Sequence, residues 1–259
     1  MSKLFQFKSY ISYWLDAVNI HSLQSPFVYE VYKNAIDKRK RVSTDPLIEK
    51  IREKFKSSVN SIEVNDLGSG SSVEKSKFRK VTDIASYGVT EKKYSQIMLG
   101  LIQYMNYKNV IELGTSLGIN TLYLSKPDQT QVTTFEGSTS LVNIATELLN
   151  DQRKNVQVIE GNIDISLPKF LETSPPIDLA FVDANHSYTP TLKYFDLLLG
   201  KSHDETCFIF DDIHLSHEMN EAWKHIRDHY QVTLTLDLFQ IGIVFINPEI
   251  RKQHYVLET

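Results

Sequence analysis

Two glycine-rich stretches of this sequence could form the turn that holds a nucleotide cofactor: "VNDLGSGSSVE" at 64–74 and "VIELGTSLGINT" at 110–121. Such a turn needs a strand before it, a helix after it and an acidic residue at the end of the next strand. The first stretch has only "SIEV" ahead of it and a lysine-rich polar segment behind it, which favours a flexible linker. The second meets all three conditions, because Glu136 ends the next apolar run, 22 residues after Gly114. The sequence therefore predicts a cofactor turn at Gly114 to Gly118.

Three carboxylates follow two later apolar runs. Asp183 lies in "VDANHSY", and Asp211 with Asp212 lies in "FDDIH". At the carboxyl edge of a parallel sheet they would repel one another unless a cation sat among them, and oxygen ligands suit Mg²⁺, Ca²⁺ or Mn²⁺. Such an ion would lower the pKa of a bound hydroxyl. The alternative is that Asp183 contacts cofactor or substrate while Asp211 and Asp212 cap the next helix or bind backbone amides.

Two histidines stand beside these carboxylates. His186 is three residues after Asp183, and its ordinary pKa of ~6.5 would let it take a proton from a hydroxyl at neutral pH. The alternative is an imidazole that only bonds a loop carbonyl. His214 follows the acid pair and is the second candidate for a catalytic histidine.

The elements that position these residues are short apolar runs alternating with helical stretches. The runs lie at 109–113, 131–136, 155–160, 177–183 and 206–212. Strands that alternate with helices of this length predict an α/β fold, with a parallel sheet and helices on both faces. The last two runs, 232–239 and 241–246, are too close for a helix between them, so they must form an antiparallel hairpin.

The first 89 residues differ from the rest and predict a helical region, followed by a cofactor-binding domain over 90–259. Leu4, Phe7, Ile11, Trp14, Leu15 and Val18 fall on one helical face. Ser25 before Pro26, and "TDP" at 44–46, have the residues of helix N-caps. The polar stretch 56–77 predicts a mobile loop.

Composition limits the classes of protein. Hydrophobic residues make up 41% of the 259 residues, enough for a full core, and the formal net charge of −4 gives no general attraction to nucleic acid or anionic lipid. The single cysteine, Cys207, excludes an internal disulfide framework. No apolar run approaches the ~18 residues needed to span a bilayer, so we expect a soluble cytoplasmic protein.

The motifs "IELGTSLG", "TFEGS", "EGNID", "LAFVDANH" and "FIFDDIH", in this order, resemble a class I S-adenosylmethionine-dependent methyltransferase. Within that family the sequence is most similar to the small-molecule O-methyltransferase-like branch, over about residues 90–247. The resemblance implies a Rossmann-like, doubly wound, seven-stranded and mostly parallel sheet that ends in an antiparallel hairpin.

The resemblance also implies roles for individual residues. Glu136 would take the two ribose hydroxyls, because an ionised carboxylate offers paired acceptors. Asp183 would contact the cofactor and serve with His186 and His214 as a candidate catalytic residue, while Asp183, Asp211 and Asp212 would bind Mg²⁺ or another divalent cation. His186 stands where metal-dependent relatives often have a lysine base. Two further groups of residues would contact the cofactor. The methionine end would be lined by Glu112, Gly114, Thr115, Gly118 and Asn120, and the adenine would be faced by Asn162, Ile163 and Asp164.

The implied activity is methyl transfer from S-adenosylmethionine to a hydroxyl oxygen of a small molecule. The sequence has no N/D-P-P-Y/F motif, which amino-methylating nucleic-acid enzymes place after the fourth strand. Two alternatives stay open: a nicotinamide dehydrogenase, which the missing third glycine disfavours, and a noncatalytic cofactor-binding or assembly module. The N-terminal helices would form a lid over the site or the contact of a homodimer.

Overall fold

The computed structural model describes residues 3–37, 45–64 and 77–258. The first glycine-rich stretch, from residue 65 onward, lies outside the described residues, as do residues 65–76 of the predicted loop over 56–77. No helix in the described part of the chain has both the length and the apolar character to cross a membrane.

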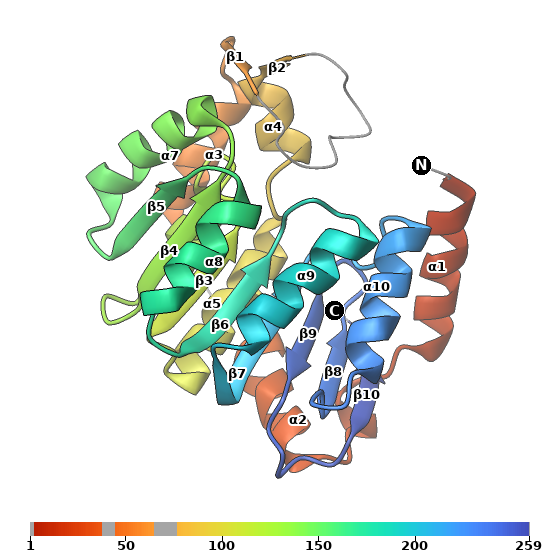
Figure 1. The fold of residues 1–259 in the computed structure, drawn as a ribbon. Helices are drawn as coiled ribbons and strands as arrows, with labels where there is room; N and C mark the ends of the chain where they lie inside the picture. Colours follow the sequence, from red (N-terminus) through yellow and green to blue (C-terminus); the bar gives the residue numbers. More distant parts are fainter. Residues whose placement is uncertain (1–2, 38–44, 65–76, 259) are drawn as a thin grey trace. The chain divides into compact units, whose positions relative to one another are not determined.

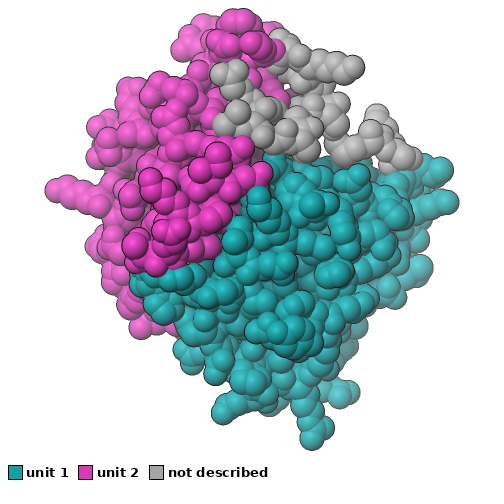
Figure 2. All heavy atoms as spheres, in the orientation of Figure 1, with its two compact units in different colours: residues 1–33, 174–259 teal, residues 34–173 magenta. Residues whose placement is uncertain are grey.

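The chain divides into two compact units, which Figure 2 shows in different colours. One unit consists of Met1–Lys33 and Ser174–Thr259, and the other of Asn34–Thr173. Each is described separately below. The predicted boundary at residue 89, between the helical region and the cofactor-binding domain, stays a prediction, because the two compact units are defined by contacts alone.

The unit Asn34–Thr173 contains three parallel strands, β3 (Asn109–Leu113), β4 (Gln131–Glu136) and β5 (Val156–Glu160). β4 pairs with both neighbours, and Glu112 on β3 is directly opposite Thr134 on β4. The helices of this unit are α3 (Pro46–Lys56), α4 (Val81–Tyr87), α5 (Lys92–Met105), α6 (Ile119–Leu124), α7 (Thr139–Gln152) and α8 (Ile163–Thr173). Its apolar core includes Leu117 and Leu122 beside the glycine turn and Ala145 and Leu149 on α7.

The same unit contains a small antiparallel pair, β1 (Ser61–Glu63) and β2 (Phe78–Lys80). β1 lies inside the stretch predicted as a mobile loop. Asp45 caps α3 as predicted, since its Oδ1 accepts a hydrogen bond from the Leu47 backbone N at 3.0 Å.

The other unit contains β6 (Ile177–Val182), β7 (Ser202–Phe210), β8 (Leu234–Asp237), β9 (Gly242–Phe245) and β10 (Gln253–Val256). β6 and β7 are parallel, whereas β9 is antiparallel to both β7 and β8, which confirms the predicted hairpin. α9 (Tyr188–Leu199) and α10 (His217–Asp228) lie side by side over these strands (Figure 1). The N-terminal helices of this unit are α1 (Lys3–Asp16), the 3-10 helix η1 (Ile20–Ser22) and α2 (Pro26–Val31), and the π-helix η2 (Tyr32–Ile36) begins in this unit and ends in the other.

The strand order is β10-β8-β9-β7-β6 in the unit that contains Ser174–Thr259 and β3-β4-β5 in the other unit. The predicted mostly parallel α/β fold is confirmed, with one difference in strand number. The described residues of the two units form eight such strands rather than the seven expected, because the chain after the hairpin returns as β10 and pairs parallel to β8. This last strand is short and partly exposed, so it has no strong periodic signal in the sequence.

The face of α1 that the sequence singles out is not buried. Leu4, Phe7, Ile11, Trp14 and Leu15 are all exposed. Ser25 does cap α2 as predicted, with its Oγ 3.5 Å from the Val28 backbone N.

Candidate functional site

The second glycine turn has the backbone conformation that its sequence predicts. Gly114 and Gly118 have φ values of 105° and 78°, in the left-handed region that favours glycine. The backbone N–H groups of Gly114 and Thr115 both donate to the Phe135 carbonyl, at 3.0 and 3.1 Å, which fixes the turn against the end of β4. A Cβ at position 118 would lie 3.4 Å from the Ala145 Cβ on α7. Both glycines therefore serve the shape of the turn.

Glu136 is held in place at the end of β4 by two backbone amides. Its Oε2 accepts a hydrogen bond from the Ser116 N at 2.9 Å, and its Oε1 accepts one from the Ser138 N at 2.9 Å. Each bond links the carboxylate to a different segment, the glycine turn and the start of α7. A fixed, half-buried carboxylate beside a glycine turn is the arrangement that a ribose diol requires, because each carboxylate oxygen can accept more than one hydrogen bond.

Glu112 is completely buried and holds the start of α6. It accepts hydrogen bonds from the Asn120 Nδ2 at 2.8 Å, from the Thr121 Oγ1 at 2.5 Å and from the Thr134 Oγ1 at 2.7 Å. Thr115 extends this network, since its hydroxyl is 2.6 Å from that of Thr134. The geometry gives Glu112 a positioning role behind the turn, and a direct contact with the cofactor stays a prediction.

Asn120 presents a buried acceptor that the described residues do not satisfy. Its Nδ2 donates to Glu112, but its Oδ1 is buried and has no hydrogen-bond partner within the described chain. A buried acceptor without a hydrogen bond lowers stability by about 1–3 kcal/mol, so this position suits a ligand that has an N–H donor. The ammonium group of a methionine moiety is such a donor.

The predicted adenine segment begins where β5 ends. The Gly161 N donates to the Glu136 carbonyl at 2.9 Å, which brings the segment beside the end of β4. The Asn162 Oδ1 accepts from the Asp164 N at 2.9 Å, so the asparagine side chain caps the first turn of α8. Ile163 is half-buried and Asp164 is exposed. Contact of these residues with a cofactor stays a prediction.

In the unit that contains β6 and β7, His186 lies between two of the three predicted carboxylates. Its Nε2 is 3.3 Å from the Asp183 Oδ1, and its Nδ1 is 3.8 Å from the Asp212 Oδ2. The Asp211 N donates to the Val182 carbonyl at 3.0 Å, which joins the ends of the two strands. The backbone φ is 26° at His186 and 56° at Asp212. Left-handed backbone at residues other than glycine is uncommon and concentrates at functional sites.

The charges of this cluster favour a protonated histidine. Burial alone would lower the pKa of His186, but its hydrogen bond to Asp183 and the charges of the neighbouring aspartates outweigh burial and raise the pKa to about 9. Burial, followed by the charge of Asp183, raises the pKa of Asp211 well above its usual value. Burial also raises the pKa of Asp212, against the opposing effect of His186. At neutral pH His186 is thus an imidazolium rather than the free base that the sequence suggested.

The predicted divalent cation does not fit this arrangement. Among the described residues no group of three or more His, Cys, Asp or Glu side chains could hold a metal ion. The position between Asp183 and Asp212 is taken by the ring of His186, which is itself the cation. No step of the chemistry below is therefore assigned to a metal.

His214 is held by two partners in the unit that contains β8. Its Nε2 is 2.8 Å from the Asp237 Oδ2, its Nδ1 is 2.8 Å from the Asn220 Nδ2, and its ring stacks on Phe239. Because both ring nitrogens are engaged, proton transfer by His214 would require one of these bonds to break. Its predicted catalytic role has no support from this geometry.

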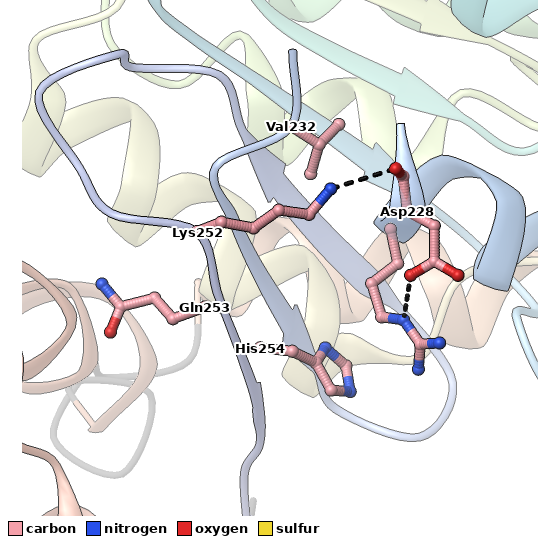
Figure 3. Close-up of a pocket in the computed structure, with 6 residues that line it drawn as sticks. Asp228, Val232, Lys252, Gln253 and His254 are labelled. Atoms are coloured by element: carbon pink, nitrogen blue, oxygen red, sulfur yellow. Dashed lines mark hydrogen bonds and ion pairs between the residues drawn. The ribbon is translucent and has the colours of Figure 1, made fainter. Parts of the chain in front are cut away.

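A small hollow of about 250 Å³ lies at the end of α10 (Figure 3). Lys252 points across it and donates from Nζ to the Asp228 carbonyl at 3.0 Å, and the Arg227 Nε is 3.0 Å from the Asp228 Oδ1. Ligand sites typically enclose about 300–1,000 Å³. This hollow is smaller than that and its charged groups already bind one another, so it is not a candidate site.

Comparison with known proteins adds to this geometry. Residues 111–213 match the sequence model of the family described as "Methyltransferase domain". They run from β3 through the glycine turn and Glu136 to the residues that follow β7. Over these residues the chain is similar to a methyltransferase domain. The predicted family and enzyme class are confirmed.

Solved structures share the fold of this methyltransferase domain. The O-methyltransferase from Bacillus cereus, in complex with SAH, is 20% identical with a TM-score of 0.54, and the match covers 61% of this chain and 83% of that one. The O-methyltransferase TomG from Streptomyces achromogenes, in complex with SAM, is 17% identical with a TM-score of 0.54, over 61% and 82%. The SAH-bound methyltransferase of Podospora anserina is 13% identical with a TM-score of 0.62, over 87% and 99%. At these identities the likeness establishes the fold.

One known protein is similar in sequence to part of this chain. "Probable protein arginine N-methyltransferase 3" of Oryza sativa subsp. indica is 23% identical over 172 residues, which is 66% of this chain and 25% of that protein. The chain thus spans a quarter of the length of this relative, and nothing about that protein's substrate is assigned to it.

The residues that sequence reasoning missed in the methyltransferase domain are those that hold the predicted ones. Ser116 and Ser138 act through backbone amides, which leave no trace in a sequence. Thr134 did leave a signal, because a buried central parallel strand is usually apolar throughout and β4 has threonine at two positions.

Proposed function

We propose that this methyltransferase transfers the methyl group of S-adenosylmethionine to a hydroxyl oxygen of a small molecule. The observation that carries the proposal is the carboxylate of Glu136, fixed by the amides of Ser116 and Ser138 at the end of β4. This group suits the ribose diol of an adenosyl cofactor, and the turn beside it has two glycines rather than the three of a dinucleotide fold.

The remaining cofactor contacts in the proposal come from the same unit. The amides of the Gly114 to Gly118 turn and the Oδ1 of Asn120 would meet the carboxylate and ammonium of the methionine moiety. Asn162 and Ile163 would face the adenine. Glu112 acts behind them, since its three hydrogen bonds fix the rotamer of Asn120 and the direction of α6.

When bound, S-adenosylmethionine supplies an electrophilic methyl group on a sulfonium. Methyl transfer then asks the protein mainly for alignment and exclusion of water, and alignment alone can supply about 7–11 kcal/mol. His186 is the group that we propose to orient an acceptor oxygen by donating a hydrogen bond from Nδ1, which is 3.8 Å from the Asp212 Oδ2 and so beyond hydrogen-bond distance of it. The charge of its imidazolium would stabilise the oxygen as the acceptor hydroxyl gives its proton to the neighbouring Asp183 carboxylate.

Two features support a small hydroxylated acceptor. The sequence has no N/D-P-P-Y/F motif after the fourth strand, and its net charge of −4 disfavours a nucleic-acid substrate. Two solved structures with this fold are named O-methyltransferases.

The test is calorimetric titration of the purified chain with S-adenosylmethionine, in parallel with NAD⁺, each with Mg²⁺ and with a chelator. We expect micromolar binding of S-adenosylmethionine alone, unchanged by the chelator. A panel of catechols, phenols and amines with radiolabelled cofactor then reports the acceptor. Binding of NAD⁺ instead would establish the dehydrogenase alternative, and label only on amines would overturn the hydroxyl acceptor.

A further inference from the structure

The first helix, α1, packs on its own unit through both aromatic contacts and hydrogen bonds, with Phe5 against His217 and Tyr13 against Phe239. Gln6 donates from Nε2 to the Leu215 carbonyl at 3.2 Å, and the Tyr13 hydroxyl donates to the Leu257 carbonyl at 2.5 Å. Ser9, between them on the helix, is half-buried. At 3.6 residues per turn these three positions share one side of the helix.

The opposite side of α1 carries large apolar side chains that face solvent. The exposed fractions are 62% for Leu4, 61% for Phe7, 40% for Ile11, 67% for Trp14 and 68% for Leu15. Scattered exposed apolar residues are ordinary, but a continuous stripe along one helix marks an interaction site. Figure 1 shows α1 at the border of its unit, beside α10.

The spacing of this stripe is that of a helix that pairs with another helix. Leu4, Phe7, Ile11 and Trp14 are separated by three, four and three residues, the alternation of a heptad seam. A second copy of α1, running antiparallel, would place Trp14 against Leu4 of the other copy and Phe7 against Ile11. Each layer then combines an aromatic with an aliphatic side chain, which fills the layers evenly. A parallel pair would instead stack Trp14 on Trp14.

Area and charge both favour a second copy as the occupant. A large aromatic side chain removes about 150–250 Å² from solvent on burial, so the stripe offers on the order of 500 Å² per copy and ~1,000 Å² for the pair. That area reaches the lower limit of a specific interface and corresponds to a weak dimer. The sequence of α1 has two lysines and one aspartate, Lys3, Lys8 and Asp16, whereas a helix that lies on a membrane has a strongly basic polar face.

We infer that the exposed stripe of α1 is the contact of a homodimer in which two α1 helices pack antiparallel. The inference is independent of the methyl acceptor and of the cofactor. It adds the face of α1 and the register of the pairing to the prediction that the N-terminal helices form the contact of a homodimer.

Sedimentation velocity of the full chain over a concentration series tests the association. We expect a dimer that dissociates in the micromolar range, and we expect Trp14→Glu to weaken it by roughly 30-fold or more, the effect of replacing a large aromatic anchor by a charge. The matched control is Tyr230→Glu, which changes an aromatic side chain that is 84% exposed outside α1. Circular dichroism melting confirms that both variants stay folded.

Cysteine crosslinking tests the register. Leu4→Cys and Trp14→Cys are prepared separately, one with a mass tag, and oxidised alone and as an equal mixture. Cys207, the only native cysteine, is buried and does not interfere. The antiparallel register predicts mixed disulfides in large excess over either homodimer.

Each contrary outcome overturns the inference. A chain that is monomeric at every concentration excludes the dimer, and if it also co-sediments with anionic phospholipid vesicles the stripe is a lipid contact. A dimer equally sensitive to Tyr230→Glu, or insensitive to Trp14→Glu, places the interface elsewhere. Homodimeric disulfides in excess would establish a parallel pair.

Discussion

The carboxylate of Glu136 allows a quantitative prediction for cofactor binding. Two hydroxyl groups of a ribose would donate to it, and a hydrogen bond to a charged group contributes about 1.5–3 kcal/mol. Glu136→Ala removes both and should weaken binding of S-adenosylmethionine by about 100- to 10,000-fold. Glu136→Gln keeps one oxygen acceptor, so its loss should be about 10- to 100-fold. The order of the two variants follows from the number of acceptors that each retains.

Isothermal titration calorimetry measures both losses, and Glu160→Gln is the matched control. Glu160 ends the neighbouring strand β5 directly opposite Glu136, and it is exposed and bonded to Thr139. We expect the control to bind like the wild type. If Glu136→Ala binds within about threefold of wild type, or if Glu160→Gln loses as much, the carboxylate does not hold the ribose and the reasoning fails.

Three further predictions follow from the two units. Glu112→Ala leaves three buried donors without their acceptor and should lower the free energy of unfolding by about 3–5 kcal/mol in urea denaturation. Glu112→Gln should lower this free energy by an amount between those of Glu112→Ala and the wild type. A loss below about 1 kcal/mol for Glu112→Ala would show that the network is dispensable. Gly118→Ala forces a Cβ into left-handed backbone, at a cost of about 1–2 kcal/mol, and should weaken cofactor binding as well as stability; a variant as stable as wild type would contradict the turn geometry. The ring protons of His186, followed by NMR, should titrate near pH 9. Because the folded-state pKa is above the unfolded value of ~6.5, its stabilising contribution is complete below pH ~6.5 and is lost as the pH rises through about 9. Asp183→Asn should lower this pKa, and an unchanged titration would refute the pairing.

The local part of the site could be predicted from the sequence. A strand, a glycine turn and a helix are neighbours along the chain, so the order of Leu113, Gly114 and Gly118 already contains their geometry. Glu136 followed from the same rule, because parallel strands end at the same edge of the sheet. The support of Glu112 could not be predicted, since it depends on the register that sets Glu112 opposite Thr134.

The charge of His186 and the direction of the apolar face of α1 depend on surrounding residues, so the sequence alone could not predict them. The type of residue at position 186 suggested a base of near-neutral pKa, but the nearby Asp183 and Asp212 make it a cation. For α1 the periodicity correctly predicted a helix with one apolar face. It could not tell which way that face points, because the same pattern serves burial in the chain's own core or contact with another molecule.

The buried network around Glu112 has a consequence for how this protein can change in evolution. Loss of the carboxylate alone leaves the hydroxyls of Thr121 and Thr134 without an acceptor, whereas replacing all partners by apolar residues of similar shape costs little. Substitution at one of these positions is therefore tolerated only together with the others. Among homologous sequences, an apolar residue at position 112 should occur with valine or another apolar residue at 121 and 134, and a mixture of the two types within one sequence should be rare.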